Sequence, residues 1–291
     1  MQVNDGFLLG AGTALAWGVT DVLVTRYTRR IGFFRALLVV HGLSLVPLVA
    51  VAVFVPRAVP AGVSVTACAV AAALGPLAIL AYIGFYRALE LGPIAIVSPI
   101  VSAYGALVVL GALVLLGESL DRYQTAGCLM VFCGVALASV DSTAGGTAGP
   151  TRTRSGIKLS VLAAAAFGAY LFLLARLSAD LGWLLPILLN RGTSLVLLIA
   201  WAIARPSPPV GTLGPLGVLG CAATGLLDAI GYVLFNRGGE IGEVALTGAA
   251  ASAYPLIPIA VGLLALRERI SRHQLVGVTG VVTGMVILSL G

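Results

Sequence analysis

The stretch Tyr82–Gly92 reads YIGFYRALELG, and 150 residues further along the chain Tyr232–Gly242 reads YVLFNRGGEIG. The two stretches share a tyrosine, a phenylalanine, an arginine, a glutamate and a glycine at matching positions. The same offset aligns Gly6–Val140 with Gly156–Leu290 without a gap, with about 40 identities among about 135 positions. Apolar composition alone would not match charged residues repeatedly at one constant offset. A self-match at a fixed long period is the signature of a duplicated unit.

The composition describes a membrane protein. Of the 291 residues, 10% are charged and 59% are hydrophobic, with a mean hydropathy of +1.08, whereas about a quarter of the residues in a soluble domain are charged. The apolar residues lie in runs of about 20, long enough for a helix to cross the hydrocarbon core. These runs lack the alternation of barrel strands. The sequence therefore predicts an all-α integral membrane protein.

Ten membrane spans are predicted, five in each half of the chain. They are Phe7–Thr28, Phe33–Val55, Val65–Ala88, Ile94–Leu116, Tyr123–Val140, Ile157–Leu177, Trp183–Ala204, Leu213–Phe235, Val244–Leu266 and His273–Leu290. Because five is an odd number, the second half enters the membrane with the opposite orientation. The halves are therefore expected to form inverted repeats, an architecture common among secondary transporters. We predict a first repeat at 1–140, a flexible polar linker at 141–156 and a second repeat at 157–291.

The net charge of +6 comes from arginines in loops, so it does not indicate a nucleic-acid-binding patch. About 12 Lys and Arg residues follow the odd-numbered spans, against about 4 on the opposite side. The positive-inside rule then places both termini outside the cell. All four cysteines lie within spans and have no metal-ligand spacing, so we interpret them as small buried hydrophobes.

The ends of the two repeats carry a further shared pattern, over Ala88–Leu137 and Gly238–Ile287. In each, a glycine turn precedes a proline-containing span, followed by a glutamate (Glu118 or Glu268), an Arg-x-Gln and a glycine-rich last span. With its two repeated sets of five spans, the chain resembles the drug/metabolite transporter superfamily, specifically its EamA-domain branch. The resemblance covers nearly the whole chain but does not specify a substrate, because that family carries amino acids, sugars, nucleotide derivatives and cationic drugs.

The resemblance also implies where substrate passes and how the chain is oriented. It implies a central cavity between the halves, lined by the first, third, fourth, sixth, eighth and ninth spans. It implies cytoplasmic termini, which disagrees with the count of Lys and Arg, so the absolute orientation stays open between the two readings.

Charged side chains inside membrane spans are costly and are candidates for function. Asp21 and His41 lie at similar depth on the first two spans, and Arg191 and Asp228 lie at similar depth on the seventh and eighth. One interpretation is that Arg191 binds a substrate anion and Asp228 a cation or a proton. The alternative is that this pair neutralises itself as a structural pair or gate. We treat Asp21, His41 and Asp228 as candidates for coupling or gating.

Hydroxyl-bearing and aromatic side chains in the middle of the spans are further candidates for substrate contact. Prolines on the fourth and ninth spans remove backbone donors, so that nearby carbonyls are available to a ligand. The alternative is that the rings pack in the core and the hydroxyls bond the preceding helical turn. These candidates are Trp17, Tyr82, Ser102, Tyr104, Tyr170, Tyr232, Ser252 and Tyr254.

A third group of polar residues, at the ends of the spans, is assigned a structural role. Pairs spaced i, i+3 lie on one helix face and form weak ion pairs. The glutamates that follow the fourth and ninth spans are expected to tie down the adjacent loop. The group consists of Arg87, Glu90, Glu118, Arg237, Glu240 and Glu268.

We expect a secondary active transporter in the cell (inner or plasma) membrane, an exporter working by alternating access with proton coupling. Its expected partners are the lipid bilayer and a small polar or zwitterionic metabolite such as an amino acid, and it is a monomer or a homodimer. One alternative is an exchanger or facilitator for cationic drug-like compounds, or for sugar or nucleotide derivatives. Another is a non-transporting membrane enzyme or assembly protein. The chain has no hydrolase, zinc-binding or phosphate-loop motif, so we expect neither an enzyme nor a cofactor.

Overall fold

The computed structural model describes residues 5–55, 59–92, 94–139, 150–204, 213–264 and 272–288, and helices make up nearly all of these ranges. The first half contributes α1 (Asp5–Ile31), α2 (Phe33–Phe54), α3 (Val65–Ala73), α4 (Gly75–Leu91), α5 (Ile94–Ser102), α6 (Tyr104–Gly111), the π-helical turn η1 (Ala112–Leu116) and α7 (Arg122–Ser139). The second half contributes α8 (Pro150–Leu181), α9 (Leu185–Ala204), α10 (Pro215–Glu240), α11 (Val244–Ala251), α12 (Leu256–Leu264) and α13 (Arg272–Leu288).

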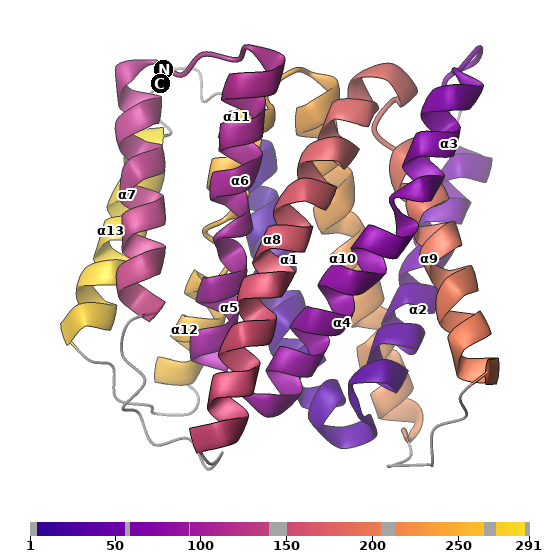
Figure 1. Ribbon diagram of the computed structural model, residues 1–291, viewed down its shortest axis with the longest axis horizontal. Helices are drawn as coiled ribbons and strands as arrows, with labels where there is room; N and C mark the ends of the chain where they lie inside the picture. Colours follow the sequence, from indigo (N-terminus) through magenta and orange to yellow (C-terminus); the bar gives the residue numbers. More distant parts are fainter. Residues whose placement is uncertain are drawn as a thin grey trace.

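The helices pack side by side into a bundle (Figure 1). Within the described ranges, eight helical stretches are long and apolar enough to cross a bilayer. The fifth span of each half is supplied by α7 and α13, which pack closely on each other at one edge of the bundle (Figure 1). The start of α7 is polar (Arg-Tyr-Gln), which lowers its mean hydropathy. The all-α, two-repeat membrane fold predicted from the sequence is confirmed.

The repeat-equivalent helices α1 and α8 run in opposite directions. Arg29, in the last turn of α1, donates a hydrogen bond to the carbonyl oxygen of Gly92 at 2.9 Å. Gly156, near the start of α8, lies so close to the same turn that an added Cβ would be 3.6 Å from the Gly92 Cα. The end of α1 and the start of α8 therefore meet at one end of the bundle. The two halves are inverted relative to each other, and α1 starts and α13 ends at the opposite end of the bundle (Figure 1).

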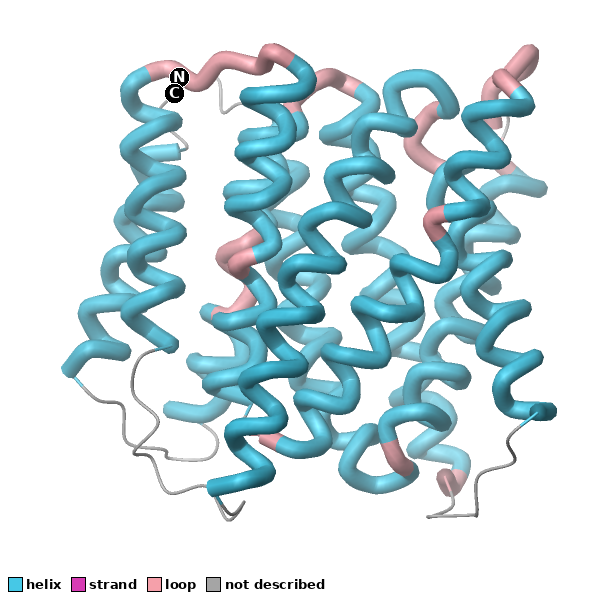
Figure 2. Tube along the Cα trace, in the orientation of Figure 1, coloured by secondary structure: helices cyan, strands magenta, loops and turns pink. Residues whose placement is uncertain are grey.

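Three predicted spans are interrupted (Figure 2). The span predicted at Val65–Ala88 divides into α3 and α4 at Leu74, because Pro76 has no N–H to donate to the preceding turn and starts a new helix. The fourth and ninth spans break at Ala103 and after Ala251. Hydropathy did not reveal these breaks, because the residues on both sides of each are equally apolar.

Part of the predicted linker is helical. Residues 141–149 lie outside the described residues, but from Pro150 onward the chain belongs to α8. Proline is well tolerated in the first turn of a helix, where its missing N–H has no partner to lose. The linker predicted at 141–156 was therefore too long at its carboxyl end.

The break between α5 and α6 is closed by a serine. The backbone N–H of Ala103 donates to the carbonyl oxygen of Ile100 at 3.3 Å, so the turn is tighter than an α-helix and leaves the carbonyl of Pro99 without its usual donor. The Ser102 hydroxyl donates to that carbonyl oxygen at 2.8 Å. The carbonyl oxygen of Pro99 is thus satisfied within its own helix.

The break between α11 and α12 repeats this arrangement. Ala253 N–H donates to the Ala250 carbonyl oxygen at 3.2 Å, and the Ser252 hydroxyl donates to the Ala249 carbonyl oxygen at 2.6 Å. In both halves a buried tyrosine follows the serine by two positions, Tyr104 in one half and Tyr254 in the other. The breaks therefore place a matched pair of tyrosines at the centre of the bundle.

Glu118 connects the halves at the end where α1 begins. Its carboxylate accepts hydrogen bonds from the backbone N–H groups of Val244 at 3.2 Å and Ala245 at 2.8 Å, the first residues of α11. These donors have no partner inside the helix. Glu118 is therefore a helix cap supplied by the opposite repeat.

The remaining residues assigned a structural role form pairs or are not described. The two repeat-equivalent ion pairs, Arg87 with Glu90 and Arg237 with Glu240, lie at opposite ends of the bundle, at the carboxyl ends of α4 and α10. Glu268 lies outside the described residues.

Candidate functional site

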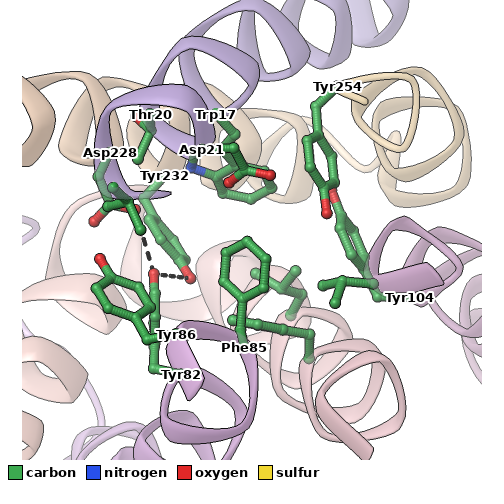
Figure 3. Close-up of a pocket in the computed structure, with 14 residues that line it drawn as sticks. Trp17, Thr20, Asp21, Tyr82, Phe85, Tyr86, Tyr104, Asp228, Tyr232 and Tyr254 are labelled. Atoms are coloured by element: carbon green, nitrogen blue, oxygen red, sulfur yellow. Dashed lines mark hydrogen bonds between the residues drawn. The ribbon is translucent and has the colours of Figure 1, made fainter. Parts of the chain in front are cut away.

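A cavity lies between the two halves near the middle of the bundle (Figure 3). It is bounded by α1, α4, α5, α6, α8, α10 and the break between α11 and α12, which are the six spans that the family resemblance implies. The centre of a water-sized sphere can occupy about 40 Å³ of it, within about 450 Å³ of space free of atoms that also includes open solvent. The lining residues are Trp17, Thr20, Asp21, Val24, Tyr82, Phe85, Tyr86, Val101, Tyr104, Phe167, Leu171, Asp228, Tyr232 and Tyr254.

Aromatic rings form most of this wall: eight of the fourteen lining side chains are aromatic. The indole of Trp17 lies edge-on to Tyr232, with ring centroids 5.0 Å apart, and edge-on to Tyr104 at 6.1 Å. Tyr104 stacks on its repeat equivalent Tyr254 at 6.2 Å, with an interplanar angle of 14°. Since aromatic faces carry partial negative charge, the lining is electrostatically suited to a cation as well as to apolar groups.

A buried ion pair borders the cavity. Arg191 on α9 is paired with Asp228 on α10, and both side chains are almost wholly excluded from solvent. The guanidinium carbon lies 5.0 Å from the ring centroid of Tyr82 and 4.6 Å from that of Tyr232, so the cation is flanked by two repeat-equivalent rings. Two of its nitrogens, Nε and Nη1, have no hydrogen-bond partner among the described residues.

The two tyrosines join this pair to the centre of the molecule. Arg191 Nη2 donates to the Tyr82 hydroxyl oxygen at 2.7 Å. That hydroxyl lies 2.8 Å from the Tyr232 hydroxyl oxygen and 3.3 Å from Asp228 Oδ1, and it can donate its proton to either acceptor. The ion pair is thereby connected by hydrogen bonds to one tyrosine from each half.

His41 occupies the position in the first half that Arg191 occupies in the second. Its ring stands perpendicular to that of Tyr82 at 4.4 Å, and neither of its nitrogens has a hydrogen-bond partner among the described residues. Its side chain is buried behind Tyr82 and does not line the cavity.

Asp21 differs from Asp228 in its surroundings. Its Oδ2 accepts a hydrogen bond from the Ser98 hydroxyl at 2.7 Å, and no ion pair in the described part of the chain includes it. The backbone carbonyl of Ser98 in turn accepts a hydrogen bond from the Tyr254 hydroxyl at 2.9 Å. Asp21 is thus a buried carboxylate held by neutral partners.

The structure brings together most of the side chains predicted to contact substrate. Seven of the predicted residues line the cavity: Trp17, Asp21, Tyr82, Tyr104, Asp228, Tyr232 and Tyr254. Arg191 and His41 lie behind Tyr82. Tyr170 instead donates to Asn190 Oδ1 at 3.0 Å, and Ser102 and Ser252 bond their own helices.

Sequence reasoning missed half of the lining, namely Thr20, Val24, Phe85, Tyr86, Val101, Phe167 and Leu171. These side chains are mostly apolar, so they carry no signal of cost inside a membrane. The duplication provides a signal that could have identified three of them. Phe167 is the repeat equivalent of Trp17, Leu171 is that of Asp21, and Phe85 is retained in both halves.

Comparisons with known proteins agree with the repeat and the fold. The sequence model of the EamA-like transporter family matches residues 4–140 and 154–290. A solved crystal structure, titled only as that of a protein, is similar over 99% of this chain and 98% of its own, with a TM-score of 0.74 and 20% sequence identity. At that identity the likeness shows the fold alone. No curated protein sequence matches the chain.

Proposed function

Because the chain belongs to the EamA-like transporter family, a family of membrane transporters of the drug/metabolite type, we propose that it is a secondary active transporter of a small polar or zwitterionic metabolite such as an amino acid. The proposed location is the cell (inner or plasma) membrane, and the proposed direction is export. The observation that carries the proposal is the cavity between the halves, with two buried carboxylates inside an aromatic wall. Ionisable groups within a membrane span are costly, and they commonly mark a substrate or ion pathway.

Transport would proceed by alternating access. In inverted-repeat transporters, one repeat or bundle rocks against the other around a site near the midplane. The breaks at Ala103 and after Ala251 give the fourth and ninth spans a point at which to bend. They also lie against each other, since a Cβ added to Gly105 would be 2.5 Å from the Cβ of Ser252. Bending of one span would therefore displace the other.

The Arg191–Asp228 pair is proposed to open when substrate or a proton arrives. In the closed arrangement each charge neutralises the other, which offsets the cost of burying both. If a proton neutralised Asp228, or a cation replaced Arg191 beside it, the guanidinium would need a new anion. A substrate carboxylate suits its planar donor fork, and no described residue forms a hydrogen bond with Nε or Nη1. The pair would thus couple occupancy of the cavity to movement of the Tyr82–Tyr232 bridge.

A second candidate function is an exchanger or facilitator for cationic drug-like compounds. Its support is Asp21, whose carboxylate has no cationic partner among the described residues. In that case Arg191 would be dispensable for binding and would serve only to hold Asp228.

The test combines binding with transport. Purified protein is screened against metabolites by thermal shift, because a ligand that binds the folded state raises its apparent stability. Each ligand found is then loaded into liposomes containing wild-type protein, and exchange with labelled ligand outside is measured. Arg176→Ala, which removes an exposed ion pair at the end of α8, serves as the matched control and should transport normally. Failure to move any bound metabolite, together with turnover of a lipid substrate, would favour an enzyme.

A further inference from the structure

The cavity contains two carboxylates whose charges are compensated differently. Asp228 is paired with Arg191, whereas Asp21 is 3% exposed and, among the described residues, its side chain is hydrogen-bonded by the neutral Ser98 hydroxyl. An ionised carboxylate removed from water without a counter-charge is strongly disfavoured. Such a carboxylate is uncharged when protonated, and a cationic ligand that takes the place of the proton compensates its charge instead.

The rings around Asp21 favour an organic cation. Figure 3 shows Asp21 next to Trp17, with Tyr104 and Tyr254 across the cavity. The faces of such rings attract ammonium groups. The Tyr104 hydroxyl is buried and has no hydrogen-bond partner among the described residues, so its oxygen is free to accept a hydrogen bond from an ammonium N–H. Carboxylate, hydroxyl and rings together match the donors and the charge of a protonated amine.

The other classes of ligand fit the Asp21 side less well. None of the lining residues is Lys, Arg or His, so an anion bound here would have two carboxylates in the same cavity and no positively charged lining side chain to compensate it. A hard metal cation requires several oxygen ligands at short range. In the part of the chain that the structure describes, no group of three or more His, Cys, Asp or Glu side chains is placed to hold one.

We propose that the transported molecule carries a protonated amine, and that Asp21, not Asp228, binds it, with the rings of Trp17, Tyr104 and Tyr254 around the ammonium group. The rest of the molecule would pack against apolar lining such as Phe85 and Phe167, so a small amine with an apolar or aromatic body is expected. This inference rests on the proposed transport function, because it assigns one end of the substrate to a place in the same cavity.

The experiment uses Trp17 as a reporter. The chain has three tryptophans, so Trp183→Phe with Trp201→Phe leaves only the indole beside Asp21. Fluorescence of this purified protein is titrated with 2-phenylethylamine and with 2-phenylethanol, its neutral isostere, and then with longer phenylalkylamines and their alcohols. We expect amines to bind at least about tenfold more tightly than the matched alcohols, a difference typical of one charge-assisted contact.

Variants of Asp21 then identify the group responsible. Asp21→Asn should abolish the preference for the amine and leave the affinity for the alcohol unchanged, whereas Asp21→Glu should restore the preference. Asp180→Asn, which removes an exposed acid on α8, is the matched control and should behave as wild type. Thermal unfolding of each variant establishes that it is folded. If Asp21→Asn does not fold, the comparison of amine and alcohol binding by the wild type and by Asp21→Glu tests the proposal.

Three results would overturn the inference: equal binding of amines and alcohols by the wild type, no amine bound at all, or a preference that survives Asp21→Asn but disappears in Asp228→Asn. Its failure is distinguishable from failure of the proposed function. The titrations measure binding in detergent and do not depend on transport. If the liposomes transported an uncharged metabolite, the proposed transport function would stand and the role of Asp21 would be rejected.

Discussion

At the scale of single residues, the Arg191–Asp228 pair is the interaction whose loss should be most costly. Removing one partner strands the other charge in the bundle, which typically costs about 3–5 kcal/mol, whereas removing both avoids that penalty. We therefore expect Arg191→Ala to lower the unfolding temperature more than the double variant Arg191→Ala/Asp228→Ala does. Arg191→Lys should keep the charge but lose the planar donor fork of the guanidinium, so it should retain only part of the stability.

Transport by the same variants tests coupling. If Asp228 carries the coupled proton, liposome transport should depend on pH, and Asp228→Asn should remove that dependence while some exchange remains. The measurement is transport across a pH series for the two single variants and the double. Additive losses with an unchanged pH profile would show that the two residues act separately, and Asp21 would be the next coupling candidate.

Gly231 keeps the cavity open. A Cβ at this position would overlap the indole of Trp17, whereas Gly192 on α9 has open space around it. Gly231→Ala should therefore push Trp17 toward Tyr104, shift the fluorescence of Trp17 and reduce transport by about tenfold or more, since misplacement of an ångström is enough to disrupt a positioned site. Gly192→Ala is the control and should transport normally. An unchanged transport rate in Gly231→Ala would show that the substrate does not pass Trp17.

At the scale of elements, the breaks in the fourth and ninth spans depend on their serines. Ser102→Ala or Ser252→Ala leaves a buried carbonyl without a donor, which typically costs about 1–3 kcal/mol. We expect a lower unfolding temperature for each variant, with the transport KM unchanged because these hydroxyls do not line the cavity. A raised KM at an unchanged unfolding temperature would instead restore them as ligands.

The cap that Glu118 places on α11 should respond to pH. Partial burial raises the pKa of this carboxyl above its ordinary value of 4.5, against the opposing effect of the Ala245 and Val244 N–H groups. The folded protein then holds the proton more tightly than the unfolded chain, so this contribution to stability is full at low pH and is lost as pH rises through the raised pKa. Glu118→Gln cannot titrate. The wild-type unfolding temperature minus that of Glu118→Gln should therefore fall as pH rises from about 4.5, and a flat difference would contradict this.

Hydropathy and the duplication predicted the spans, their inversion and the shared depth of Arg191 and Asp228, because each of these follows from position along a helix. They did not predict that Ser98 binds Asp21, or that Tyr82 and Tyr232 meet. Those contacts depend on how each helix is rotated about its axis, and a span that is apolar all round leaves that rotation undetermined. The helix breaks were missed for a related reason, since their hydrogen bonds come from serines that also suit an unbroken helix.

At the scale of the whole molecule, the tyrosines between the halves are repeated, whereas the buried charged residues are not. Tyr82 and Tyr104 recur as Tyr232 and Tyr254, and they form the bridge and the stack between the halves. The charged positions differ, since Asp21 corresponds to Leu171, Asp228 to Ala78 and Arg191 to His41. In the proposed mechanism, the inverted repeats would allow a symmetrical movement, and the single unsymmetrical set of charges would give the substrate one orientation in the cavity.

The inversion makes a strict prediction about repeat-equivalent positions. Asp5 and Ser155 are equivalent by the offset of 150, but α1 starts at one end of the bundle and α8 starts near the other. In a background with all four cysteines replaced, Asp5→Cys and Ser155→Cys should react with a membrane-impermeant maleimide from opposite sides of the membrane. Arg87→Cys and Arg237→Cys should likewise react from opposite sides, with Arg87 on the side of Ser155.

The same labelling decides between the two orientations, because the arginine-rich end should face the cytoplasm if the positive-inside rule holds. Reaction of Asp5→Cys from the outside would support that rule, and reaction from the cytoplasm would support the orientation implied by the family. Labelling of both equivalent positions from one side would contradict the inverted repeat itself, and with it the rocking movement proposed for transport.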